Sequence, residues 1–173
     1  MILHNDLDGF SSSLHEQFKT IGLTTGCFDL LHPGHLWLLE RAKSESDIVI
    51  VGINNDDSVR RLKGETRPIL KAYERAHMLA ALRCVDYVIV FDEDDPCRMV
   101  EQIQPNLFFK GDDWRDRPMP ERAVVERLGG HVVLVPRYRN YSTTSLAQAN
   151  ESLRIVFIGD RLRQLSHSGR SIK

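Results

Sequence analysis

Cysteine is scarce in this sequence. Its 173 residues include only Cys27, Cys84 and Cys97. Because the number is odd and the three are spread along the chain, the pattern argues against a disulfide framework. A reducing cytoplasm is therefore the expected compartment.

An excess of charge of one sign is also missing. Lys and Arg number 23, Asp and Glu number 24, and the formal net charge is −1. No general field attracts nucleic acid or an anionic membrane, and we expect neither as a partner. No apolar run approaches membrane-spanning length. The N-terminal residues, with Asp6 and Asp8, do not resemble a secretory signal. Because the net charge is close to zero, any phosphate-binding charge must be local.

The chain does contain a regular alternation of apolar strand-like and helix-like segments. With 42% apolar residues it can bury one good core. This alternation predicts an α/β protein: a single Rossmann-like domain with a five-stranded, mostly parallel sheet and helices on both faces. The five expected strands are Ile21–Leu23, Ile48–Ile53, Val85–Phe91, Leu107–Phe109 and Val132–Val135.

No repeat or linker divides the chain, but its two ends differ from the middle. Residues 1–19 show no clean period, and we expect a loosely packed N-terminal arm with a short helix reaching Phe18. Residues 20–150 form the predicted domain. Residues 151–173 begin with one more apolar strand and continue as a basic, serine-rich tail.

The stretch from Thr24 to His35 carries the strongest functional signal. An apolar segment leads into Gly26, and an amphipathic run follows from Leu36, which is the strand–turn–helix order of a nucleotide-binding unit. Pro33 suits the first helical position, with His32 as the cap residue. His32 and His35 are three residues apart and fall on one side of the first turn. Two imidazoles at a helix N-terminus predict a site for polyphosphate.

The other polar clusters also follow predicted strands. They cover residues 54–71, 110–114 and 138–144. In open α/β sheets the ligand lies beyond the carboxyl ends of the strands, where the strand order reverses. We therefore expect the strand at Ile21–Leu23 to neighbour the one at Leu107–Phe109, so that the histidines and the loop after Lys110 face one crevice.

His32-Pro33-Gly34-His35 resembles the His-x-Gly-His signature of the cytidylyltransferase-like nucleotidyltransferases. Residues 21–146 resemble more narrowly the nucleotidyltransferase domain of ADP-heptose synthases. The matching pieces are Thr25-Gly26-Cys27-Phe28-Asp29-Leu30-Leu31-His32, Asn54-Asn55-Asp56, Arg61-Leu62-Lys63-Gly64, Arg67-Pro68, Glu74-Arg75, Val85-Asp86, Lys110-Gly111-Asp112-Asp113-Trp114 and Ser142-Thr143-Thr144. Two features depart from that family: Asp112 stands where a second glycine is usual, and residues 137–141 are unusually basic and aromatic.

The resemblance implies transfer of a nucleoside monophosphate, AMP from ATP above all, to a sugar 1-phosphate such as heptose 1-phosphate, with release of pyrophosphate. Catalysis would then consist of positioning and charge stabilisation. The expected catalytic residues are His32, His35 and Lys63. The expected nucleotide-binding residues are Thr25, Gly26, Cys27, Phe28, Arg75, Lys110, Gly111, Asp113, Ser142, Thr143 and Thr144. The expected substrate-binding residues are Asp29, Asn54, Asp56 and Arg67.

Mg²⁺ is the expected cofactor, bound through the triphosphate, because no dedicated acidic cage is visible. The expected partners are ATP or CTP and a phosphorylated small-molecule acceptor, and the family resemblance also implies a homodimer or a larger assembly. No protein-bound metal is expected. A zinc site formed by Cys27, His32 and His35 is a competing interpretation, but a fourth ligand at usable spacing is missing.

Three other functions remain open at this point. The first is a CTP-dependent cytidylyltransferase acting on a polyol phosphate such as glycerol 3-phosphate, or on a phosphonate. The second is a non-catalytic nucleotide-binding module, against which the joint presence of His32, His35, Lys63 and Arg75 argues. The third is a fragment of an aminoacyl-tRNA synthetase, which ranks low because the chain has no broad basic surface.

Overall fold

The computed structural model describes residues 2–4 and 7–138. Strands and helices alternate along this part of the chain. The strands are β1 (Ile2–His4), β2 (Ile21–Gly26), β3 (Ile48–Asn54), β4 (Tyr87–Phe91), β5 (Leu107–Gly111) and β6 (His131–Val135). The helices are α1 (Asp8–Gln17), α2 (Pro33–Glu45), α3 (Asp56–Lys63), α4 (Ala72–Ala80), α5 (Cys97–Ile103), α6 (Pro120–Arg127) and a 3-10 turn, η1 (Asp112–Trp114).

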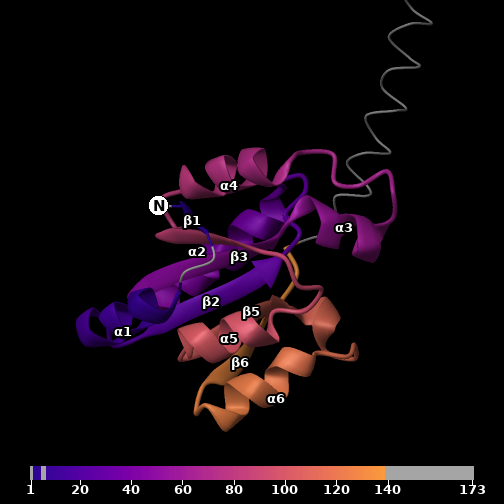
Figure 1. Cartoon of the computed structure of the whole chain (residues 1–173). Coiled ribbons are helices and arrows are strands. Elements are labelled where there is room, and N and C mark those ends of the chain that lie inside the picture. The colour runs from indigo at the N-terminus through magenta and orange to yellow at the C-terminus, as the bar shows by residue number, and fades with distance from the viewer. Residues whose placement is uncertain (1, 5–6, 139–173) are drawn as a thin grey trace, which may run out of the picture.

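The strands form one parallel sheet in the order β1-β4-β3-β2-β5-β6 (Figure 1). From β2 the chain adds β3 and β4 on one side and then returns to add β5 on the other. The strand order therefore reverses between β2 and β5, where Leu23 pairs with Phe108. This confirms the predicted neighbourhood of these two strands and fixes the place where a ligand should bind.

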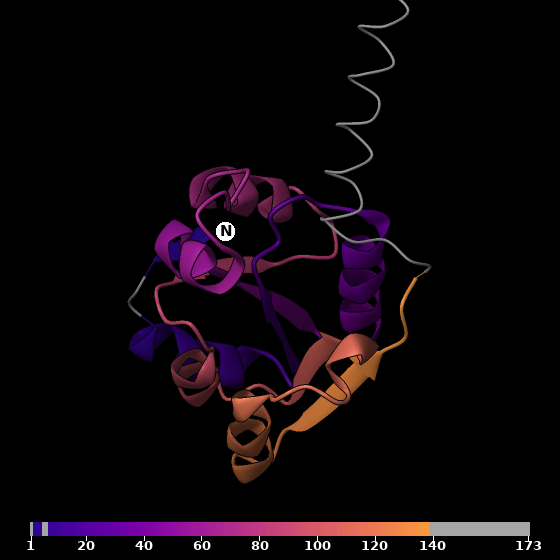
Figure 2. The same ribbon diagram turned by 90° about the vertical axis from the view of Figure 1, so that its right-hand side faces the viewer.

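Helices cover both faces of the sheet (Figure 2). Leu39 of α2 and Leu79 of α4 pack into one core cluster. Leu14 of α1, Ile103 of α5 and Val125 of α6 pack into the cluster on the other face. Along β3, neighbouring side chains belong to opposite clusters, and all seven residues are buried. A strand enclosed on both sides needs a continuous apolar run, which is what the sequence provides.

The predicted fold class is confirmed, with one addition: β1 is a sixth strand. It pairs with Val88–Val90 at the edge of the sheet. The residues after it also differ from the expected loose arm, because Leu7 and Leu14 are buried beside α5. A strand of three residues has no readable period, and α1 has a weakly segregated apolar face, so the sequence pattern did not reveal this packing.

Some expectations fall beyond the described residues. Ser142, Thr143 and Thr144, the tail at 151–173 and the domain boundary near residue 150 all lie there. Within residues 2–4 and 7–138, no helix is both long and apolar enough to cross a membrane.

Candidate active site

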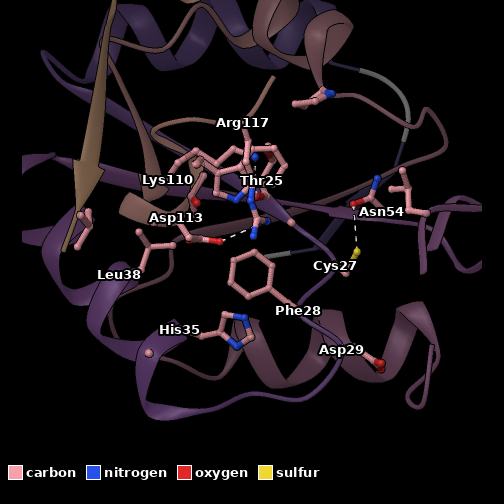
Figure 3. Close-up of a pocket in the computed structure, with 18 of the residues that line it drawn as sticks. Thr25, Cys27, Phe28, Asp29, His35, Leu38, Asn54, Lys110, Asp113 and Arg117 are labelled. Atoms are coloured by element: carbon pink, nitrogen blue, oxygen red, sulfur yellow. Dashed lines mark hydrogen bonds and ion pairs between the residues drawn. The ribbon is translucent and has the colours of Figure 1, made fainter. Parts of the chain in front are cut away.

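A cleft of about 920 Å³ lies at the carboxyl ends of β2, β3 and β5. It is the predicted location, and most of the predicted site residues line it (Figure 3). These residues are Thr25, Gly26, Cys27, Phe28, Asp29, His32, His35, Asn54, Lys63, Arg67, Lys110, Gly111 and Asp113. Arg75 and Asp56 do not line the cleft.

The start of α2 matches the sequence prediction. His32 is the N-cap, and Pro33 is the first helical residue. The Nδ1 atom of His32 accepts a hydrogen bond from the backbone N–H of His35 at 3.2 Å. Because Nδ1 is the acceptor, the neutral His32 ring carries its proton on Nε2. The cap therefore leaves one ring N–H donor for a ligand at the helix N-terminus.

The two imidazole rings of the motif are stacked. Their centroids lie 3.7 Å apart and their planes differ by 16°. Burial lowers the pKa of His35 to about 3, with a further lowering effect of the His32 ring and an opposing effect of the Leu30 carbonyl. Burial also lowers the pKa of His32. Both rings are therefore neutral near pH 7, so each has a ring N–H group to offer as a hydrogen-bond donor rather than a positive charge.

The turn between β2 and α2 brings Phe28 against His35. Phe28 has φ +45°, a left-handed conformation that non-glycine residues rarely adopt. Its buried ring lies 4.8 Å from the His35 ring, centroid to centroid. A Cβ atom at Gly26 would lie 3.3 Å from Cε2 of Phe28. Glycine at this position therefore leaves room for the ring that supports His35.

One side of the cleft, which we call the β3 wall, is formed by Asp29, Asn54, Lys63 and Arg67. Asp29 is the centre of its bonding. One carboxylate oxygen accepts from Arg67 Nη1 at 2.7 Å, and the other accepts from the backbone N–H groups of Ile69 and Leu70 at 2.7 and 3.1 Å. Asp29 therefore fixes the 64–71 loop, which carries Arg67 to the cleft. Lys63 also lines the cleft, and its side chain is exposed.

Arg75 and Asp56 are corrections to the sequence prediction. The Arg75 guanidinium is fully buried behind the β3 wall and donates to the carbonyls of Leu70, Cys27 and Asn54. It also donates to Asp56 at 2.9 Å, and Asp56 accepts from the backbone N–H of Ala72. With these bonds made, neither side chain is available to a triphosphate or a substrate. Together they hold the ends of β2 and β3 to the start of α4.

The opposite side, which we call the β5 wall, is formed by Lys110, Asp113, Trp114, Arg117 and Arg137. Lys110 is buried and lies 4.5 Å from the centroid of the Trp114 ring. The Asp113 carboxylate is approached by Arg117 at 3.5 Å and by Arg137 at 3.6 Å. Both guanidiniums are more than half exposed. This wall therefore offers cations at the surface of the cleft.

The structure adds residues to the site that the sequence analysis did not select. Glu121 pairs with Lys110 at 3.1 Å. Trp37 on α2 packs against Tyr138, with ring centroids 5.5 Å apart, and donates to the Pro136 carbonyl. Basic and aromatic character at 137–141 was a signal for part of this cluster. Glu121 had none, because a glutamate in the first turn of a helix is common.

Cys27, His32 and His35, the candidates for a zinc site, all line the cleft. In the part of the chain that the structure describes, no three His, Cys, Asp or Glu side chains are grouped as metal ligands. The Sγ atom of Cys27 lies 3.9 Å from Oδ1 of Asn54 instead. Burial raises the pKa of this thiol, which disfavours the thiolate that a metal requires.

Comparison with known proteins agrees with the geometry. The chain is 46% identical over 144 residues to the bifunctional protein HldE of Geobacter metallireducens, and 47% identical over 144 residues to that of Nitrobacter hamburgensis. These matches cover 82% and 83% of this chain but only 29% of either relative. The chain thus spans less than a third of the length of these curated relatives.

Solved structures share the fold. The lipopolysaccharide core biosynthesis protein of Thermoplasma volcanium superposes with a TM-score of 0.57 at 26% identity, covering 71% of this chain and 98% of that one. Pantoate-beta-alanine ligase of Francisella tularensis has a TM-score of 0.56 at 18% identity, covering 87% of this chain and 77% of that one, and supports the fold alone. The model of the family described as cytidylyltransferase-like matches residues 23–166. The chain belongs to this cytidylyltransferase-like family of nucleotidyltransferase enzymes.

Proposed function

We propose that the chain transfers AMP from ATP to a sugar 1-phosphate, heptose 1-phosphate in the first instance, and releases pyrophosphate. The observation that carries the proposal is the stacked pair His32 and His35 at the N-terminus of α2, at the switch point of the sheet. The similarity to the HldE proteins supports the choice of acceptor class.

In the proposed reaction, an oxygen of the acceptor phosphate attacks the α-phosphorus of ATP. A new P–O bond forms, the bond between the α-phosphorus and its bridging oxygen breaks, and pyrophosphate leaves. The acceptor phosphate is already ionised, so no protein nucleophile is needed. The protein contributes positioning and stabilisation of the charge that builds on the phosphate oxygens.

His32 and His35 are suited to that stabilisation because they are neutral donors held in place before the substrate arrives. The cap bond fixes His32, and Phe28 supports His35. A preorganised donor of this kind is worth about 3 kcal/mol of transition-state stabilisation. Lys63 at the cleft entrance would neutralise charge on the triphosphate.

Mg²⁺ enters this proposal as part of the substrate, the magnesium complex of ATP. The carboxylates that line the cleft all have partners in the protein. Asp29 pairs with Arg67, Asp94 with Arg61, Glu121 with Lys110, and Asp113 with Arg117 and Arg137, while Asp95 accepts a hydrogen bond from the backbone N–H of Cys97. Such a donor set does not suit a resident ion, whereas the oxygens of a triphosphate bind Mg²⁺ well. We therefore assign no step to a protein-bound metal.

The decisive experiment measures pyrophosphate release from ATP and, separately, from CTP, with a panel of sugar 1-phosphates and glycerol 3-phosphate. Turnover with ATP and a sugar 1-phosphate is the expected result. The His35→Ala variant should lose about a hundredfold or more in kcat, since one preorganised donor is removed. His131→Ala is the matched control, because His131 is exposed at the start of β6 and does not line the cleft.

Other outcomes would replace the proposal. Turnover with CTP and glycerol 3-phosphate alone would make the protein a cytidylyltransferase. Tight ATP binding without turnover on any acceptor, together with unchanged ATP affinity in His35→Ala, would indicate a non-catalytic nucleotide-binding module.

A further inference from the structure

A buried ion pair forms part of the cleft floor. The Nζ atom of Lys110 lies 3.1 Å from Oε1 of Glu121, and the two side chains are 7% and 2% exposed. Both residues line the cleft. Two charges removed from water are tolerated only with good mutual geometry and further hydrogen bonds. The pair therefore needs an explanation beyond ordinary core packing.

The two partners come from opposite ends of one loop. Lys110 lies near the end of β5, and Glu121 is in the first turn of α6, directly after Pro120. A carboxylate at that position is favoured by the helix dipole. Between them the chain runs through Trp114 and Arg117, which also line the cleft. The ion pair thus closes the loop that supplies most of the β5 wall.

The Lys110 ammonium is held from three directions. Glu121 accepts one hydrogen bond, the Thr25 carbonyl at the end of β2 accepts another at 3.2 Å, and the Trp114 ring lies 4.5 Å away. An ammonium has three N–H donors. The acceptors that the described residues provide therefore leave one donor for a ligand in the cleft.

Glu121 counters two changes that would remove the Lys110 ammonium from the cleft: movement of the side chain and loss of its proton. A lysine on a flexible four-carbon stem can swing towards water, and a buried one can lose its proton. Burial lowers the pKa of Lys110, whereas Glu121 from α6, Asp113 from η1 and Cys27 after β2 raise it. Glu121 is the largest of the raising influences and the one that also forms a hydrogen bond.

We propose that Glu121 is a positioning residue that holds the Lys110 ammonium against the Thr25 carbonyl and the Trp114 ring, so that its remaining N–H donates to a phosphate oxygen of the nucleotide. This proposal rests on the proposed function only in that the cleft binds a nucleoside triphosphate. It does not depend on which acceptor is used.

The first test compares ATP affinity in the parent and in Glu121→Gln by calorimetry at about pH 6.5 and about pH 9. Without the carboxylate, the pKa of Lys110 falls further, and the ammonium is lost as pH rises through that lower value. We expect the Kd for ATP to rise about tenfold at the higher pH and less at the lower one. Glu126→Gln is the control, since Glu126 is an exposed acid on the same helix.

The second test asks whether Glu121 acts through Lys110. In the Lys110→Met background, Glu121→Gln should leave the Kd for ATP unchanged, because the group that it positions is gone. Where turnover is measurable, Glu121→Gln should raise KM for ATP more than it lowers kcat. Glu121→Asp keeps the charge, so it should retain the pH profile of the parent while weakening affinity through a longer contact.

A purely structural role would give a different pattern. Glu121→Gln would then lower the melting temperature while leaving the Kd for ATP and its pH dependence as in the parent, and the proposal would be overturned. An equal loss of affinity in the parent and Lys110→Met backgrounds would overturn it too. If Glu121→Gln does not fold, Glu121→Asp decides, and unchanged affinity there is a negative result. Parent ATP binding without transfer would refute only the proposed function.

Discussion

The two walls of the cleft use the same residue type in opposite ways. Arg75, behind the β3 wall, has no exposed side-chain area and lies 2.9 Å from Asp56. Arg117 and Arg137 on the β5 wall are 57% and 55% exposed, and they approach Asp113 at 3.5 and 3.6 Å. A guanidinium whose donors are bonded inside the protein shapes the cleft. One at the surface with long contacts can exchange them for a ligand.

The largest expected effect separates these two roles through stability. Arg75→Met removes one partner of a buried, charged network and should lower the free energy of unfolding by about 3–5 kcal/mol. Chemical denaturation measures this directly. Arg83→Met, at an exposed arginine just beyond α4, is the control. If Arg75→Met kept the stability of the parent but lost ATP affinity, Arg75 would belong to the binding surface after all.

The next effect concerns His35, which lines the cleft from the first turn of α2. The unfolded chain binds a proton at His35 near the ordinary pKa of 6.5, whereas the folded chain resists it until about 3. The folded state therefore loses stability as pH falls from 6.5 towards 3, by up to about 1.4 kcal/mol per pH unit. Denaturation curves across this range should show the slope, and His35→Gln should reduce it. An unchanged slope in that variant would assign it to other groups.

A smaller effect is expected on the β5 wall. Arg117→Met removes a surface cation beside Trp114, so the KM for ATP should rise several-fold, equivalent to about 1 kcal/mol. The free energy of unfolding should stay within about 0.5 kcal/mol of the parent. Arg115→Met, at an exposed arginine two residues earlier that does not line the cleft, serves as the comparison. A large loss of stability would place Arg117 with the buried guanidiniums instead.

The smallest effect is expected at Asp112 and Arg137, which belong to the two features that depart from the ADP-heptose synthase pattern. Asp112 and Arg137 contact each other, with the Arg137 Nε atom 3.6 Å from an Asp112 oxygen. Because the pair is partly exposed, a double-mutant cycle with Asp112→Gly and Arg137→Met should give a coupling of at most about 0.5 kcal/mol in stability. A coupling several times larger would mean that these departures stabilise the wall jointly.

Much of the fold could be predicted from sequence because its signals are local. The β-branched run in β3 indicates a buried strand, and Gly26 indicates a turn, each from a few neighbouring residues. His32 and Pro33 mark the start of α2 for the same reason, and the structure confirms them as the cap and the first helical residue. Even the neighbourhood of β2 and β5 followed from a general rule of open sheets.

The rest of the site depends on contacts that no local pattern records. From the sequence alone, Arg75 is expected to be a free cation next to Glu74. In the structure its four hydrogen-bond acceptors come from segments up to 48 positions away. Glu121 reads as an ordinary helix-start acid, and only the fold brings it to Lys110. Charge and motif therefore identify which residues are near the ligand site, whereas burial and bonding decide which of them remain available to it.

The short strand β1 has a practical consequence for anyone who alters the N-terminus. It occupies the outer edge of the sheet by pairing with Val88–Val90 of β4. Deleting it would expose unpaired backbone N–H and C=O groups on a strand that is otherwise hydrophobic, and such edges recruit strands from other molecules. A version that lacks β1 would therefore risk self-association and insolubility.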